Sequence, residues 1–215
     1  MVFILLFGLM FLSSCVGDPS MDYYNFAVAD LRSEVAVTEI HWAGSVDSFG
    51  NSYDLDNFIE IRNFYVGDVD VSFWNVIIED VYGFRQVITI PSNTILKSGQ
   101  VYTIGRTTNH AFSYFDLIYD NLLIPTRNLK ITIKDGSGKV IDNVDLTLFD
   151  FMVAGYKLPR LRKSMVRKIG FFGIERGDNV DNWRSYALPV TTTNVRTNFY
   201  VNTLCSPGQI LTGEF

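Results

Sequence analysis

A polar loop near the start of the chain holds the side chains that could most readily bind a metal ion. Four oxygen-bearing residues lie within ten positions of one another: Asp47, Asn51, Asp54 and Asp56. Calcium prefers carboxylate and amide oxygens, so these residues form a weak candidate calcium site. Their spacing differs from that of an EF-hand, and Asp and Asn also favour ordinary loops because they hydrogen-bond to their own backbone. We therefore expect no metal and no other cofactor.

His41 precedes this loop and is the first candidate for a catalytic base. The only other histidine, His110, lies about seventy positions away, so the sequence does not indicate a His-rich zinc site. A Gly-x-Ser-x-Gly motif, which would mark an activated serine, is missing from the sequence. The alternative to catalysis is a strand histidine that faces solvent or hydrogen-bonds to a neighbour. We expect no enzymatic activity and no catalytic residue.

A cluster of basic residues follows in the second half of the chain. Six positive charges lie within twelve positions: Lys157, Arg160, Arg162, Lys163, Arg167 and Lys168. The whole chain has a net charge of −5, so the cluster is a local asymmetry. It is a candidate contact for an anionic membrane or another polyanion. The alternative is a solvated, mobile loop. A net acidic chain is not typical of a dedicated nucleic-acid binder, so we expect no specific nucleic-acid partner.

The N-terminus resembles an export signal. An apolar run from Val2 to Leu12 has the length of a signal-peptide core and is too short to span a membrane. The following residues, Leu12-Ser13-Ser14-Cys15, resemble the lipobox of bacterial lipoproteins. The resemblance implies cleavage before Cys15 and attachment of acyl chains such as palmitate to that residue. No Lys or Arg precedes the run, and a plain secretory signal or an uncleaved anchor remain the alternatives.

Two cysteines are present, Cys15 and Cys205. If Cys15 carries lipid, Cys205 has no partner within the chain, and we expect it to be a small apolar residue of the core or a loop. Two or more acyl chains anchor a protein stably to a membrane, whereas one chain binds only marginally. The sequence therefore predicts a lipoprotein of the bacterial cell envelope, facing the periplasm or the cell surface.

Short runs of alternating apolar and polar residues predict an all-β domain. Ile59 and Ile61 alternate with Glu60 and Arg62, which is the period of a half-buried strand. We expect strands over residues 35–42, 58–63, 69–80, 86–90, 101–105, 128–134, 139–145, 164–172 and 182–187. Asp135-Gly136 is expected to close a hairpin between two of them. We expect Ile40, Ile59, Ile61 and the three tryptophans, Trp42, Trp74 and Trp183, to lie in the core.

The order of these segments is similar to that of the lamin-tail domain of exported bacterial proteins. The opening segments that carry the resemblance are Val37-Thr38-Glu39-Ile40, Trp42-Ala43-Gly44-Ser45 and Phe58-Ile59-Glu60-Ile61-Arg62-Asn63. The later ones are Val69-Asp70-Val71 with Trp74, Ile88-Thr89-Ile90-Pro91, Thr94-Ile95-Leu96 with Gly99, Leu129 to Asp142, Ser164 to Arg167 with Trp183, and Ser206-Pro207-Gly208. Val166 departs from the family, which has an acidic residue before the arginine. The resemblance implies an immunoglobulin-like β-sandwich used for interaction or scaffolding, and it carries over no catalytic residue.

These observations predict four regions: a signal peptide (1–14), a lipid-anchored tether (15–34), a lamin-tail-like β-sandwich (35–208) and a C-terminal tail (209–215). The predicted function is that of a non-enzymatic structural or binding module. Its partners would be a membrane, through Cys15, and an unknown protein or polyanion. The alternative function is an envelope enzyme, or an accessory subunit of a hydrolase, that uses the 43–56 loop and His41.

Overall fold

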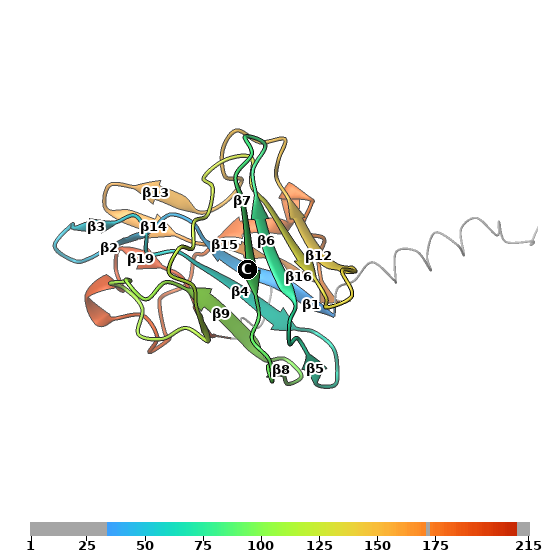
Figure 1. Ribbon diagram of the computed structural model, residues 1–215. Coiled ribbons are helices and arrows are strands. Elements are labelled where there is room, and N and C mark those ends of the chain that lie inside the picture. The colour runs from blue at the N-terminus through green and yellow to red at the C-terminus, as the bar shows by residue number, and fades with distance from the viewer. Residues whose placement is uncertain (1–33, 171–172, 210–215) are drawn as a thin grey trace, which may run out of the picture. The chain divides into compact units, whose positions relative to one another are not determined.

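The computed structural model describes residues 34–170 and 173–209. The predicted signal peptide, the lipidation site at Cys15 and all of the tether except Glu34 lie outside the described residues. The chain divides into two units, Met1–Arg32 and Ser33–Phe215, and every described residue belongs to the second. The described residues form an all-β fold with two short 3-10 helices and no α-helix (Figure 1).

Six strands form the larger sheet, in the order β10-β9-β4-β1-β15-β18. Their bounds are β1 Val35–His41, β4 Phe58–Asn63, β9 Val101–Gly105, β10 Leu117–Ile118, β15 Met165–Arg167 and β18 Trp183–Ser185. Neighbouring strands are antiparallel except β9 and β10, which are parallel. Strands β1 and β4 lie at the centre and are buried almost throughout, which indicates that both faces of this sheet are covered.

Four antiparallel strands form the second sheet, in the order β12-β11-β6-β7. Their bounds are β6 Asn75–Glu79, β7 Arg85–Thr89, β11 Lys130–Lys134 and β12 Val140–Asp145. In Figure 1 the strands of this sheet lie in front of β1 and β4. Residues from both sheets join one buried cluster, which includes Val37, Ile40, Ile59, Ile61, Ile104, Val76, Ile78, Ile88, Ile131 and Ile133. The two sheets are therefore consistent with a β-sandwich.

The face of the larger sheet that points away from this core is also covered. Side chains alternate between the faces of a strand, so Phe58 and Glu60 point away from the core that Ile59 and Ile61 join. A bulge between Val37 and Glu39 shifts the register of β1. A second buried cluster lies on this outer face and consists of Phe58, Ala111, Phe112, Phe115, Val190, Val195, Phe199 and Cys205. The segments 106–116 and 187–209 supply most of it.

Short elements complete the fold. The strands pair as β2 Ser45–Val46 with β3 Ser52–Tyr53, β5 Val69–Asp70 with β8 Ile95–Leu96, and β16 Ile169–Gly170 with β17 Gly173–Ile174. A small sheet joins β13 Tyr156–Leu158, β14 Leu161–Lys163 and β19 Thr203–Leu204. The 3-10 helices are η1 Val180–Asn182 and η2 Thr197–Phe199. Within the described ranges, no helix is long and apolar enough to cross a membrane.

Several predicted elements are confirmed. Strands β4 and β9 have the expected bounds, and the predicted hairpin is β11–β12. Its turn places Gly138, rather than Gly136, at a positive φ of 89°. Trp42 and Trp183 are buried, and each indole N–H donates to a backbone carbonyl, that of Ala154 or Gly177. Trp74 is only partly buried at the edge of the core.

Three expectations were wrong. The strand expected over residues 69–80 is interrupted between β5 and β6, because Phe73 has a positive φ of 63° within a turn closed by Trp74 N–H and the Val71 carbonyl. The basic cluster does not form a mobile loop, because it lies largely on β13, β14 and β15. The strand expected over 164–172 is split into β15 and β16, and its last two residues lie outside the described ranges.

Candidate functional site

His41 lies in a buried and largely apolar environment. The ring is fully buried, stacks on Phe58 with centroids 5.2 Å apart, and meets Phe112 edge-on at 5.6 Å. Its Nε2–H donates to the Gly44 carbonyl at 2.8 Å, while Nδ1 has no partner within the described residues. Burial lowers the pKa of His41 to about 4, so the ring is neutral near pH 7. This side chain packs on two phenyl rings and bonds to a neighbour, and no carboxylate of residues 34–170 or 173–209 hydrogen-bonds to its ring.

Of the four calcium candidates, Asp47 and Asn51 contact each other, whereas Asp54 and Asp56 bind other partners. Asp47 accepts hydrogen bonds from the backbone N–H groups of Phe49 and Asn51 and from the Asn51 side chain, which lowers its pKa against the effect of desolvation. Asp54 pairs with Lys157 at 3.3 Å and Arg162 at 3.6 Å. In residues 34–170 and 173–209, no three His, Cys, Asp or Glu side chains form a group that could hold a metal ion.

Asp56 is buried and fastens the loop to the segment that follows β9. It accepts hydrogen bonds from the Ser45 hydroxyl at 2.5 Å and from the backbone N–H groups of His110 and Ala111, both at 3.0 Å. The His110 ring stacks on Tyr53 with centroids 4.0 Å apart. The carboxylate therefore satisfies the buried Ala111 N–H and the more accessible His110 N–H at once.

Burial divides the basic cluster. Arg167 is buried and forms a two-pronged ion pair with Asp142, with Nη1–Oδ2 and Nη2–Oδ1 distances of 2.7 and 3.0 Å. This pair connects β15 of the larger sheet to β12 of the smaller one. Arg162 is also buried and contacts Asp54 and the Ser52 hydroxyl. These two residues hold the fold together and cannot present their charge to a membrane or polyanion.

The remaining basic residues are more accessible. Lys157 and Arg160 are exposed, whereas Lys163 and Lys168 are half-buried. The Lys163 ammonium group lies 5.7 Å from the ring centre of Tyr156. The candidate polyanion surface is thus reduced to Lys157, Arg160, Lys163 and Lys168, and Lys157 already pairs with Asp54.

Two buried glutamates lie on the outer face of the larger sheet. Glu39 on β1 and Glu60 on β4 are register partners, and both are almost completely buried. Glu39 accepts hydrogen bonds from the hydroxyl of Ser164 and from the hydroxyl and backbone N–H of Ser206. Glu60 accepts from the Thr38 hydroxyl at 2.8 Å and from the Gly208 N–H at 2.9 Å. The C-terminal segment is therefore fixed to the sheet through these carboxyl groups.

The environment of the two glutamates favours their neutral forms. Burial raises the pKa of both carboxyl groups. The pKa of Glu60 is raised well above its usual value because the charge of Glu39 adds to the desolvation. Burial also raises the pKa of the Cys205 thiol, which lies in the second apolar cluster and is fully buried. This placement confirms that Cys205 is a small core residue and makes it a poor nucleophile near neutral pH.

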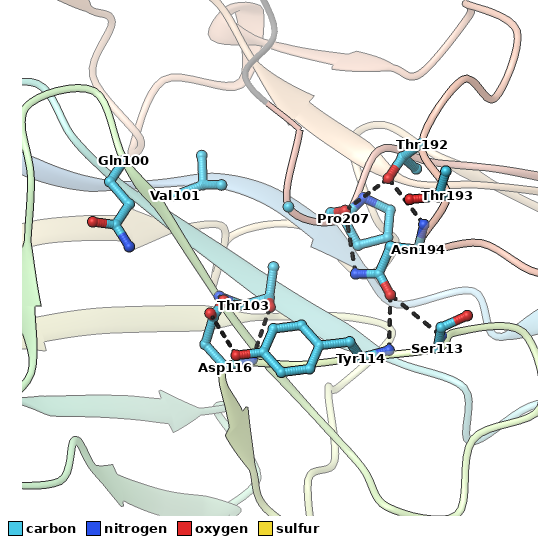
Figure 2. A pocket seen from close by; sticks show the side chains of 11 residues that line it. Gln100, Val101, Thr103, Ser113, Tyr114, Asp116, Thr192, Thr193, Asn194 and Pro207 are labelled. Atoms are coloured by element: carbon cyan, nitrogen blue, oxygen red, sulfur yellow. Dashed lines mark hydrogen bonds between the residues drawn. The ribbon is translucent and has the colours of Figure 1, made fainter.

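A pocket of about 550 Å³ opens beside this pair. We call it the Tyr114 pocket. Three segments line it: β9 with the residue before it (Gln100, Val101, Thr103), the loop residues Ser113, Tyr114 and Asp116, and the C-terminal residues Thr192, Thr193, Asn194, Pro207 and Gly208 (Figure 2). Gly208 connects the two features, because it lines the pocket while its N–H binds Glu60.

Hydrogen bonds set the shape of the pocket. Asp116 Oδ2 accepts from both the N–H and the hydroxyl of Thr103 at 2.7 Å, and Asp116 Oδ1 accepts from the Tyr114 hydroxyl at 3.1 Å. Asn194 Oδ1 accepts from the backbone N–H groups of Ser113 and Tyr114, and its Nδ2 donates to the Pro207 carbonyl. Figure 2 shows the Tyr114 ring lying between Asp116 and Asn194. The aromatic ring is thus held in place at both ends.

The sequence predictions missed this pocket and the glutamate pair. The sequence contains features of both, but these features do not identify a site. Glu39 and Glu60 lie between apolar neighbours in their strands, and the run 112–119 is rich in aromatic residues. In the structure Phe112 and Phe115 are buried, and Tyr114 alone of the three aromatic residues from 112 to 115 is exposed.

Comparison of the chain with known family models and with curated proteins finds no match.

Proposed function

We propose that this chain is a lipid-anchored protein of the bacterial cell envelope whose lamin-tail-like, immunoglobulin-like β-sandwich is a non-enzymatic binding module. Cys15 would carry the lipid, and the Tyr114 pocket would receive the ligand. The two packed sheets support the sandwich part of this proposal. The segments that resemble the start of a lamin-tail domain support it further, because they become paired neighbours, β1 and β4.

The observation that carries the proposal is the separation of the pocket from the candidate base. The pocket is lined by Tyr114, Asp116 and other polar residues, but His41 is not among its lining residues. His41 is instead enclosed by phenyl rings and neutral. A hydrolase needs a nucleophile or water beside a base that can accept its proton. The pocket offers a shaped polar surface, which suits binding.

Metabolic labelling with a clickable fatty acid tests the anchor. The wild-type chain should be labelled and should fractionate with membranes. Cys15→Ser should lose both properties, whereas Cys205→Ser should retain them because that thiol is buried in the fold. Equal labelling of wild type and Cys15→Ser would contradict the anchor.

A further inference from the structure

The polar groups of the Tyr114 pocket fall into two classes, those already used by the fold and those left free. Within the described residues, the hydroxyls of Ser113 and Thr193 and the Nε2 amino group of Gln100 have no hydrogen-bond partner, and all three residues are exposed. A ligand could bind to them without breaking a contact of the protein. These groups are uncharged, and hydroxyls can both donate and accept.

Tyr114 adds an apolar surface to these polar groups. Its side chain is 62% exposed although the bonds of Asp116 and Asn194 hold both its hydroxyl and its backbone. A fixed, exposed ring loses little conformational freedom when a ligand packs on it. Binding sites commonly combine such an aromatic surface with a few well-placed polar groups. The ligand should therefore have both an apolar face and several hydroxyl groups.

The charge of the pocket disfavours anionic ligands. Among the described residues that line it there is one carboxylate, Asp116, and no Lys or Arg. A phosphate, sulfate or uronate would be repelled by this carboxylate without a cation to offset the repulsion. Asp116 can instead accept hydrogen bonds from neutral hydroxyl groups. The accessible basic residues, such as Lys157 and Arg160, do not line this pocket.

A peptide added as a further strand also fits poorly. Binding of that kind needs free backbone groups at a strand edge. At the pocket, the Thr103 N–H of β9 already donates to Asp116, and the N–H groups of Ser113 and Tyr114 donate to Asn194. Side chains, rather than backbone groups, are thus left to recognise the ligand.

We propose that the Tyr114 pocket binds a neutral saccharide, with the sugar ring packed on Tyr114 and its hydroxyls bonded to Gln100, Ser113, Thr193 and Asp116. The proposal rests on the proposed function of the domain as a binding module and specifies the ligand class. A saccharide satisfies both requirements because it has C–H faces that pack on aromatic rings and hydroxyls around its rim.

The test is calorimetric titration of the full-length protein in detergent with neutral chito-, cello- and malto-oligosaccharides. Wild type should bind at least one of them. Tyr114→Ala should weaken that binding by about tenfold through loss of the aromatic contact. Thr193→Val, which removes a single exposed hydroxyl, should weaken it by about threefold. Tyr82→Ala, which alters another exposed tyrosine in the β6–β7 turn, should leave the affinity unchanged.

Two parallel titrations, with heparin and with an uncharged peptide, distinguish a wrong ligand class from a wrong function of the domain. Failure of every neutral oligosaccharide to bind would overturn the saccharide proposal, and so would equal affinity of wild type and Tyr114→Ala. Heparin or peptide binding that depends on Tyr114 would overturn the ligand class but leave the binding-module function standing. Loss of fatty-acid labelling concerns only the anchor, because the titrations do not depend on it.

Discussion

Glu39 and Glu60 face the C-terminal segment from neighbouring strands, and Glu60 binds the N–H of Gly208, a residue that also lines the Tyr114 pocket. Both carboxyl groups have raised pKa values because burial disfavours their charged forms. The hydrogen bond from the Gly208 N–H to Glu60 thus joins this titratable pair to a residue that lines the proposed binding site.

The raised pKa of Glu60 predicts how stability depends on pH. A carboxyl group that binds its proton more tightly in the folded protein than in the unfolded chain adds to the free energy of unfolding. This stabilisation is greatest below pH 4.5 and is lost as pH rises toward the folded-state pKa. Glu60→Gln should remove this loss of stability at high pH, because an amide does not ionise. Its oxygen can accept a hydrogen bond from the Gly208 N–H, and its nitrogen can donate one to the Thr38 hydroxyl. We expect the variant to melt above wild type at pH 8, by about 3 °C for each kcal/mol gained.

Thermal melts of wild type and Glu60→Gln from pH 4.5 to 8 measure this effect. The difference should shrink toward pH 4.5. Tyr186, with a pKa of about 12, and the buried Cys205 thiol remain protonated in this range, so they do not obscure the result. Glu79→Gln is the control, because Glu79 forms a surface pair with Arg85. A Glu60→Gln protein that melts below wild type at pH 8 would contradict the prediction.

His41 should show the opposite pH dependence. Its pKa is lowered from 6.5 to about 4, so the unfolded chain binds the proton more tightly and folding is weakened as pH falls from 6.5. The full difference corresponds to on the order of 3 kcal/mol. In NMR spectra the His41 ring should keep the chemical shifts of a neutral imidazole down to pH 5. A titration midpoint near pH 6.5 would show that the ring reaches solvent.

The stability of the fold should depend on both members of the Arg167–Asp142 ion pair being present together. Arg167→Leu removes the guanidinium group that pairs with the buried Asp142 carboxylate, and we expect it to destabilise the fold by about 3–5 kcal/mol in urea denaturation. The double variant Arg167→Leu/Asp142→Leu should recover part of that loss. Arg85→Leu, at an exposed pair, should change stability by less than about 1 kcal/mol. Equal losses at the buried and exposed sites would refute the prediction.

Gly105 should be required for the loop that carries Tyr114. A Cβ atom at this position would lie 2.2 Å from the Phe115 ring, so Gly105→Ala must displace that ring or the strand. We expect a loss of about 1–3 kcal/mol and weaker saccharide binding. Gly136→Ala is the matched control because its Cβ would meet no atom within 4 Å. Unaltered stability and binding in Gly105→Ala would show that the loop is not positioned by this contact.

Local patterns predicted much of the fold because they reflect which side of a strand is buried. Ile59 and Ile61 alternate with polar residues and lie in the core as expected. The interruption at Phe73 was not predictable, because the surrounding residues are as apolar as a continuous strand and the backbone conformation breaks the pairing. The β13–β14 hairpin lacks a regular alternation, so the sequence did not reveal it either.

The candidate site was less predictable than the fold because it depends on contacts between distant segments. Gln100, Tyr114 and Asn194 meet only after the C-terminal segment covers the larger sheet. The accessibility of the basic cluster could not be predicted from the sequence either. Arg160 and Arg162 are two positions apart, but Arg162 is buried while Arg160 is exposed. Only the fold decides which of these charges a partner can reach.

A crystal structure of the protein with the neutral oligosaccharide that binds most tightly would test most directly whether the outer face of the larger sheet is a binding face. We predict that a sugar ring lies against Tyr114, with hydroxyl groups within hydrogen-bond distance of Asp116 and Thr193. Sugar bound on another face, or an empty Tyr114 pocket at saturating ligand, would contradict this prediction.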